Sequence, residues 1–183
     1  MKIFFLRLLF TLAIVFFEFS FFGVLFPQVS APLIILVSIV AWTLLFEFPR
    51  VLYTILPLAA LSDIIASGEV GALTLYAVAL AYATSFLSRR LLIERHGFGM
   101  ALYALFAGSG VLGYVVFNSI LFRDSLSFWN TGAFTHLFSS VFSVAFFLSF
   151  MLSPLLFVVM YRVIRRFEGY IDSLVQKEIL KMQ

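Results

Sequence analysis

Two apolar segments joined by a short turn make up LAALSDIIASGEVGALTLYAVALAYATSFLSRR, residues 58–90. Its first apolar segment contains a single acidic residue, Asp63, and leads into a short turn, SGEVG, at residues 67–71. Its second apolar segment ends at Arg89 and Arg90. Apolar segments of this length satisfy their backbone polar groups inside a bilayer only as helices, so the stretch predicts a helical hairpin. The arginine pair predicts that the hairpin returns to the inner side of the membrane.

The composition of the whole chain is that of a membrane protein. Of its 183 residues, 63% are hydrophobic and only 11% are charged, and the mean hydropathy is +1.13. A soluble domain of this size needs a more highly charged surface. We therefore predict an all-α integral membrane protein in which residues 1–161 form a compact bundle of six transmembrane helices. The expected spans are Phe4–Phe26, Ser30–Phe46, Val51–Ala66, Val70–Leu87, Phe98–Phe122 and Ala133–Tyr161.

The distribution of basic residues predicts the orientation. With six spans and an inner N-terminus, eleven of the twelve Lys and Arg residues face the inner side, and only Arg123 faces outward. This is the pattern of the positive-inside rule, so we expect both termini inside. The isoelectric point near 9.4 reflects this excess and does not indicate nucleic-acid binding. The first apolar run is expected to be a retained helix and not a cleaved signal peptide, because Glu18 interrupts it.

Residues 162–183 differ from the rest of the chain. Ile164, Phe167, Ile171 and Leu174 recur at helical spacing among charged residues, which predicts an amphipathic C-terminal helix on the cytoplasmic side. Two interpretations remain open for this helix. It lies on the inner membrane surface, or it docks a cytoplasmic partner.

Three polar residues within the expected spans are candidates for a structural or functional role: Glu18, Asp63 and Asn118. Counting along the helices places both acids in the outer half of the bilayer, so that they could meet. An unpaired charge at the centre of a span costs at least about 2.5 kcal/mol. The structural interpretation is a neutral carboxyl group, or one that bonds a Ser, Thr, Tyr or Asn side chain of a neighbouring helix. The functional interpretation is a proton or substrate site. Without a basic partner inside the membrane and without a chain of further acids, we favour the structural interpretation.

Motifs that suggest catalysis or metal binding do not have the surroundings that such chemistry needs. GSGVLG, residues 108–113, matches a dinucleotide fingerprint, but it lies inside an expected span, where small residues predict close helix packing. Ser109 and His136 differ in expected depth by about 15 Å, too far for a nucleophile and its base. His96 and His136 fall on opposite faces of the membrane, so they cannot share a metal ion. We therefore expect no enzyme, no metal site and no cofactor.

The hairpin at residues 58–90 resembles the most recognisable region of the MreD family, small membrane subunits of the bacterial rod-shape system. In that family an apolar helix carries an Asp and turns through a Ser- and Gly-rich outer loop, and the next helix ends in arginines on the cytoplasmic side. The resemblance rests on residues of this hairpin, which covers about a fifth of the chain. Those residues are Asp63, Gly68, Gly71, Arg89 and Arg90.

The resemblance implies a non-enzymatic scaffold in the bacterial cytoplasmic membrane. Such a protein would bind the bitopic protein MreC and support the glycosyltransferase RodA and its transpeptidase partner. It would also act on MreB filaments, and so assist peptidoglycan synthesis for cell shape.

Two other functions fit six spans in a chain of this length. The first is the substrate-binding S component of energy-coupling factor vitamin transporters, whose fold the MreD family resembles. Its first span typically carries small residues four apart, whereas FFLRLLFTLAIVFFEFSFFG, residues 4–23, is bulky throughout. The second is a small proton-coupled carrier that would use Glu18 and Asp63.

Overall fold

The computed structural model describes residues 2–25, 32–46, 48–65, 71–90, 97–122 and 144–180. Six helical segments run through these residues, and none of the described residues forms a strand. The first segment joins α1 (Lys2–Phe17), a π-helical turn η1 (Glu18–Phe22) and α2 (Gly23–Leu25). The others are α3 (Leu33–Leu45), α4 (Phe48–Ile65), α5 (Ala72–Arg90), α6 (Gly97–Phe122) and α8 (Val144–Leu180).

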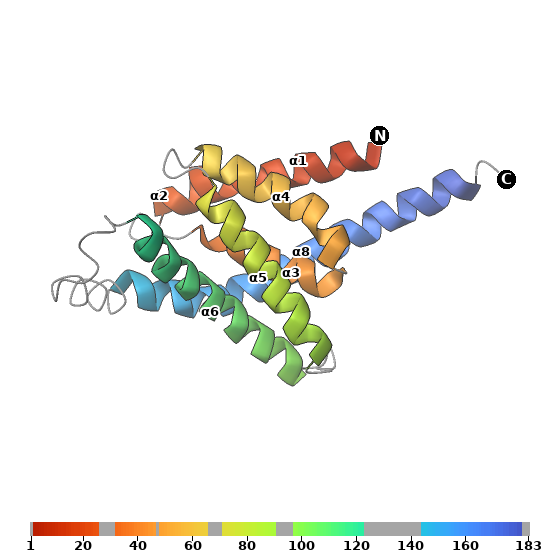
Figure 1. Cartoon of the computed structure of the whole chain (residues 1–183). Helices are drawn as coiled ribbons and strands as arrows, with labels where there is room; N and C mark the ends of the chain where they lie inside the picture. The colour runs from red at the N-terminus through yellow and green to blue at the C-terminus, as the bar shows by residue number, and fades with distance from the viewer. Residues whose placement is uncertain are drawn as a thin grey trace, which may run out of the picture.

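Successive helices alternate in direction, so the bundle has two distinct ends. Both termini lie at one end, and the junctions from α2 to α3 and from α4 to α5 lie at the other (Figure 1). The start of α1, the start of α4 and the end of α5 also lie at the end with the termini (Figure 1). These helix ends carry Arg7, Arg50 and Arg89, so we call this end the basic end. We call the opposite end the capped end, for the contacts described below. Placing both termini at one end is what the expected topology requires.

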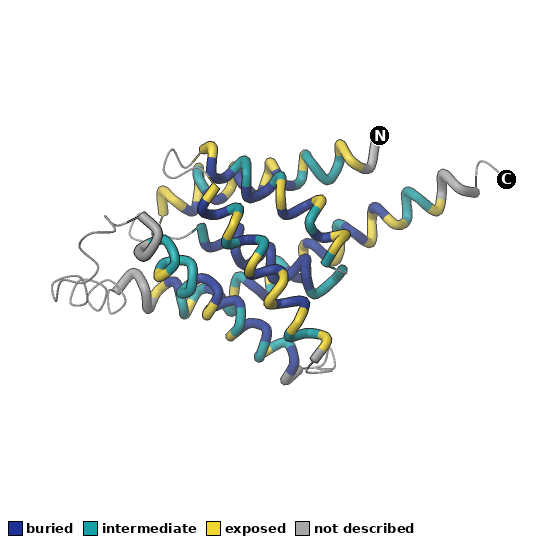
Figure 2. Tube along the Cα trace, viewed as in Figure 1, coloured by how far each residue is buried: buried dark blue, intermediate teal, exposed yellow. Residues whose placement is uncertain are grey.

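Helix α3 is the centre of the bundle. Eleven of its 13 residues are buried, from Leu33 through Thr43 (Figure 2). It packs against α1, α4, α5, α6 and α8. At 1.5 Å per residue the helix is about 20 Å long, too short to cross a bilayer by itself. An apolar helix of this length is typical of a protein core, and here the other helices supply that core.

Four of the described helices are long and apolar enough to cross a membrane. They are Phe4–Leu25, Phe48–Ile65, Gly99–Asn118 and Leu148–Gln176. These helices and the buried α3 make the chain a multi-pass membrane protein, as its composition predicts. Each of the six expected spans contains a helix in the described residues, but only four of them are confirmed as long and apolar enough to cross a membrane. The second expected span holds the short helix α3, and the fourth holds α5, which is not among the four candidates. The first eleven residues of the sixth expected span, residues 133–143, lie outside the described residues.

Helix α8 is the longest element and continues past the expected end of the membrane domain. It runs without a break through Pro154 and across the predicted domain boundary between residues 161 and 162. Ile164 and Ile171 are buried beyond that boundary. The apolar face of the predicted C-terminal helix therefore packs on the protein itself as far as Ile171.

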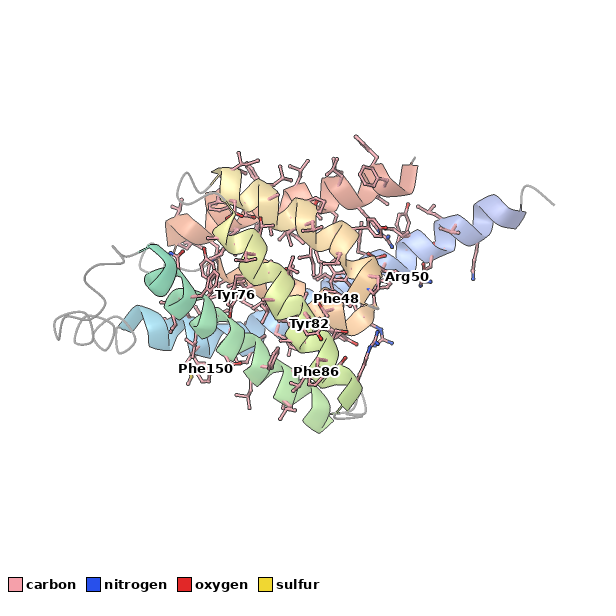
Figure 3. The ribbon with its side chains drawn as sticks, in the orientation of Figure 1. Phe48, Arg50, Tyr76, Tyr82, Phe86 and Phe150 are labelled. Atoms are coloured by element: carbon pink, nitrogen blue, oxygen red, sulfur yellow. The ribbon has the colours of Figure 1, made fainter. Side chains whose placement is uncertain are left out.

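Small residues of α6 allow close packing on both of its neighbours. A Cβ atom at Gly108 would lie 2.8 Å from Ser153 Oγ of α8, and one at Gly110 would lie 2.8 Å from Leu80 of α5. The hydroxyl of Tyr76 donates a hydrogen bond of 2.6 Å to the carbonyl oxygen of Gly110 (Figure 3). The prediction that the glycine motif serves helix packing is confirmed, although Ser109 itself is exposed.

Candidate functional site

The Glu18 carboxylate binds the N-terminus of the central helix. Its Oε1 accepts a hydrogen bond of 2.9 Å from the backbone N–H of Leu33, and its Oε2 accepts one of 2.7 Å from the N–H of Ile34. Glu18 is 5% exposed and opens the π-helical turn η1. Pro32 precedes the helix and has no N–H of its own to satisfy. A buried carboxylate therefore supplies the acceptor that the first turn of α3 lacks.

Asp63 makes the same kind of contact with the N-terminus of α5. Its Oδ1 accepts a bond of 3.0 Å from the N–H of Leu73, and its Oδ2 accepts one of 2.9 Å from the N–H of Thr74. The Thr74 hydroxyl adds a third bond of 2.5 Å to Oδ2. Gly71 enters the helix with φ +98°, a conformation that side chains rarely adopt. Asp63 is 5% exposed, so this junction too is closed by a buried acid.

The two contacts share a physical basis. The start of a helix carries unpaired N–H groups and the positive end of the helix dipole, and both favour a negative charge. Backbone N–H groups only donate, so all four carboxyl oxygens act as acceptors. We refer to these contacts as the Glu18 cap and the Asp63 cap.

The caps differ in part from the sequence-based expectation. Asp63 does bond a Thr side chain of a neighbouring helix, but its other partners, and both partners of Glu18, are backbone amides. The two acids bind different helices, α3 and α5. Because sequence gives no direct sign of which amides a carboxyl group will reach, backbone partners were not foreseen.

The other predicted site residues do not join either cap. Asn118 is half-buried near the end of α6. Arg89 is exposed in the last turn of α5, and Arg90 is the last residue of that helix. Gly68 lies outside the described residues, as do both histidines of the chain. Within the described residues, no group of three His, Asp or Glu side chains is placed to hold a metal ion.

A third buried acid, Glu168, lies at the basic end and was missed by sequence reasoning. Glu168 of α8 is 4% exposed, and its Oε2 lies 2.6 Å from Nη2 of Arg7 on α1. Its Oε1 accepts a bond of 3.3 Å from the indole N–H of Trp42. The rings of Phe10 and Phe167 stack beside this group, with centroids 3.9 Å apart. The pairing ties the first helix to the last across 161 positions of sequence.

One signal in the sequence could have found Glu168. It lies four residues after Ile164 and three before Ile171, so it belongs to the same face of the helix as the apolar stripe. An acid on an apolar stripe needs a partner, and Arg7 was the available basic residue in the first span.

Next to this ion pair lies a cavity of about 490 Å³ between α1, α4 and α8. It combines charged side chains of both signs with apolar and aromatic ones. The Nε of Arg7 is buried there and has no hydrogen-bond partner within the described part of the chain. The lining residues are Phe4, Arg7, Leu8, Thr11, Phe46, Arg50, Val51, Tyr53, Thr54, Pro57, Glu168 and Asp172.

A groove at the capped end offers less to a ligand. It is lined by Ala60, Asp63, Ile64, Gly71, Thr74, Leu75 and Val78. Its polar side chains are Asp63 and Thr74, which already bond each other. The groove therefore presents a mainly apolar surface.

Comparison with known proteins assigns no family. No protein-family model, no curated protein and no solved structure matches this chain.

Proposed function

We propose that this chain is a non-enzymatic scaffold subunit of a cell-wall elongation complex in the bacterial cytoplasmic membrane, similar to the MreD family. The observation that supports the proposal is the Asp63 cap. Asp63 and Gly71, two of the residues that carry the resemblance, lie at this cap, and the Asp63 carboxylate holds the hairpin together with both oxygens occupied. A role in assembly accounts for such a residue, because its carboxylate is engaged in contacts within the hairpin.

The outer surface of the bundle suits an assembly role. The first helical segment exposes a series of large aromatic side chains, which favours contact with lipid or with the transmembrane helix of a partner. A bitopic protein of the MreC type is the partner that we propose, with RodA, its transpeptidase and MreB filaments in the same complex. The exposed aromatic side chains are Phe4, Phe5, Phe16, Phe17 and Phe21.

The alternative function, an S component of a vitamin transporter, receives less support. Such a protein needs free polar groups to orient a small substrate in a concave site. In the described residues of the capped end, the groove holds mainly apolar side chains, and Asp63 is already engaged. The same engagement of Glu18 and Asp63 disfavours a proton-coupled carrier.

Co-purification tests the proposal. The tagged chain is expressed with the MreC-type protein of the same genome, and membranes are solubilised in mild detergent. We expect the MreC-type protein to be retained, and a bitopic protein of unrelated function, expressed at the same level, to be lost. Failure to retain it, together with a vitamin bound to the purified chain, would overturn the scaffold role in favour of transport.

A further inference from the structure

The cavity at the basic end has two charged groups that the bundle does not use. Glu168 is paired with Arg7, and this leaves Arg50 and Asp172 as the other charged side chains of the lining. Both are exposed, and in the described part of the chain neither has an ion-pair partner. Since one is positive and the other negative, the cavity offers an unpaired charge of each sign.

Arg7 adds a second guanidinium group to the lining of the cavity. Its Nη2 serves Glu168, but its Nε is buried and, among the described residues, no acceptor reaches it. The Nε does not face the cavity, but the Arg7 side chain as a whole is 36% exposed, so its guanidinium adds positive charge to the lining. The guanidinium groups of Arg7 and Arg50 together favour an anionic oxygen group such as a phosphate.

The position of the cavity indicates where its ligand comes from. Arg50 lies in the first turn of α4 and Arg7 in the second turn of α1, at the end where both termini lie (Figure 3). Two aromatic rings of the lining are exposed outward, Phe4 by 67% and Tyr53 by 80%. Basic residues beside exposed aromatic rings are typical of the headgroup level of a membrane.

We propose that this cavity binds the headgroup of a zwitterionic phospholipid with a primary ammonium, that is, a phosphoethanolamine group. The phosphate oxygens accept hydrogen bonds from the guanidinium groups of Arg50 and Arg7, and the ammonium donates to Asp172. The cavity volume of about 490 Å³ lies within the usual range for small-molecule sites, about 300–1,000 Å³. The inference does not depend on the proposed scaffold role.

Charge decides between this headgroup and the common alternatives. An anionic phosphatidylglycerol headgroup supplies the phosphate but no cation, so Asp172 would face a second negative charge. A phosphatidylcholine headgroup carries a cation without N–H groups, so it forms no hydrogen bond to the Asp172 carboxylate. Of these three headgroups, only phosphoethanolamine provides both an anion for Arg50 and an N–H donor for Asp172.

Native mass spectrometry of the full chain tests the proposal. The protein is released from micelles that contain equal amounts of phosphatidylethanolamine, phosphatidylglycerol and phosphatidylcholine, and the retained lipids are counted. We expect phosphatidylethanolamine to be retained over both others. Arg50→Gln is expected to lower retention of all three lipids, and Asp172→Asn to remove the preference for ethanolamine. One charged contact near a membrane surface corresponds to a change of about fivefold in each case.

Arg89→Gln is the matched control, since Arg89 is an exposed arginine at the same end but outside the cavity. Equal retention of phosphatidylethanolamine and phosphatidylglycerol by the unaltered protein would overturn the proposal. So would Arg50→Gln and Asp172→Asn variants that behave like Arg89→Gln. Soluble glycerophosphoethanolamine is added in a separate arm. If it displaces the lipid at millimolar concentration, a free headgroup compound and not a membrane lipid is the ligand, and the lipid assignment fails.

Discussion

The two ends of the bundle bury acids in different ways. At the capped end, Glu18 and Asp63 bind backbone N–H groups, which are fixed once the helix has formed. At the basic end, Glu168 binds the side chains of Arg7 and Trp42, of which Arg7 is long and partly exposed. The first kind of contact joins helices that are neighbours in sequence, and the second joins the first helix to the last.

The contacts at the capped end are expected to hold their helices more firmly than the ion pair at the basic end does. A carboxylate on a helix N-terminus accepts bonds from two donors at once. Its partners are backbone N–H groups, which have no alternative conformations once the helix has formed. An arginine side chain must be ordered to form its ion pair, and solvent and salt weaken that pair. We therefore expect the capped end to contribute more to stability than the basic end.

The largest effect is expected from Glu18→Gln. The amide retains one acceptor oxygen, so one buried N–H of α3 loses its partner and the helix loses a charge at its N-terminus. The free energy of unfolding should fall by about 2–3 kcal/mol, as for hydrogen bonds to a buried charge. Unfolding in mixed micelles of increasing SDS content measures it. Phe17→Leu, at an exposed neighbour, is the control, and a Glu18→Gln protein as stable as this control would contradict the cap.

Asp63→Asn should cost somewhat less, about 1.5–2 kcal/mol, because the Asp63 cap borders an open groove and Thr74 helps to fill the lost contact. The same SDS titration measures it. If the variant has normal stability and abundance but loses MreC-type binding, the carboxylate has a role beyond holding the hairpin. That result would mean that the Asp63 cap has a role in partner binding in addition to the structural role expected for both caps.

The pair at the basic end should be weaker than either cap. A double-mutant cycle with Arg7→Gln and Glu168→Gln is expected to give a coupling energy of about 1 kcal/mol that falls with added salt. The cycle is measured by SDS unfolding at low and high ionic strength. A coupling above that of the caps, or one unaffected by salt, would reverse the proposed order of the two ends.

The smallest effect is expected from Thr74→Val. This change removes only the hydroxyl that supplements the Asp63 cap and leaves both backbone bonds, so the cost should be about 0.5–1 kcal/mol. Thr74→Ser keeps the hydroxyl and serves as the control in the same assay. Equal stability of the Val and Ser variants would mean that the backbone amides alone hold Asp63.

Much of the fold follows from local properties of the sequence. Apolar length and basic ends predict helices and their direction, and the turn before Gly71 predicts the hairpin. The sequence does not predict which residues come into contact when they lie far apart in the chain. The partners of Glu18 are amides 15 and 16 positions further along the sequence, and Glu168 meets Arg7 from the other end of the chain. Such contacts depend on the packing of the whole bundle, which helical periodicity does not encode.

Glu18 precedes α3 in the chain, and we expect this order to matter when the helices insert into the membrane. The start of α3 lies below the bilayer surface if its 20 Å are centred in a hydrocarbon core about 30 Å thick, so its first N–H groups would face lipid tails without an acceptor. Glu18 reaches the insertion machinery earlier in synthesis than α3 does. The first helical segment thus enters the bilayer with the carboxyl group that the N-terminus of α3 needs as an acceptor. We expect this segment and α3 to leave the translocation channel together.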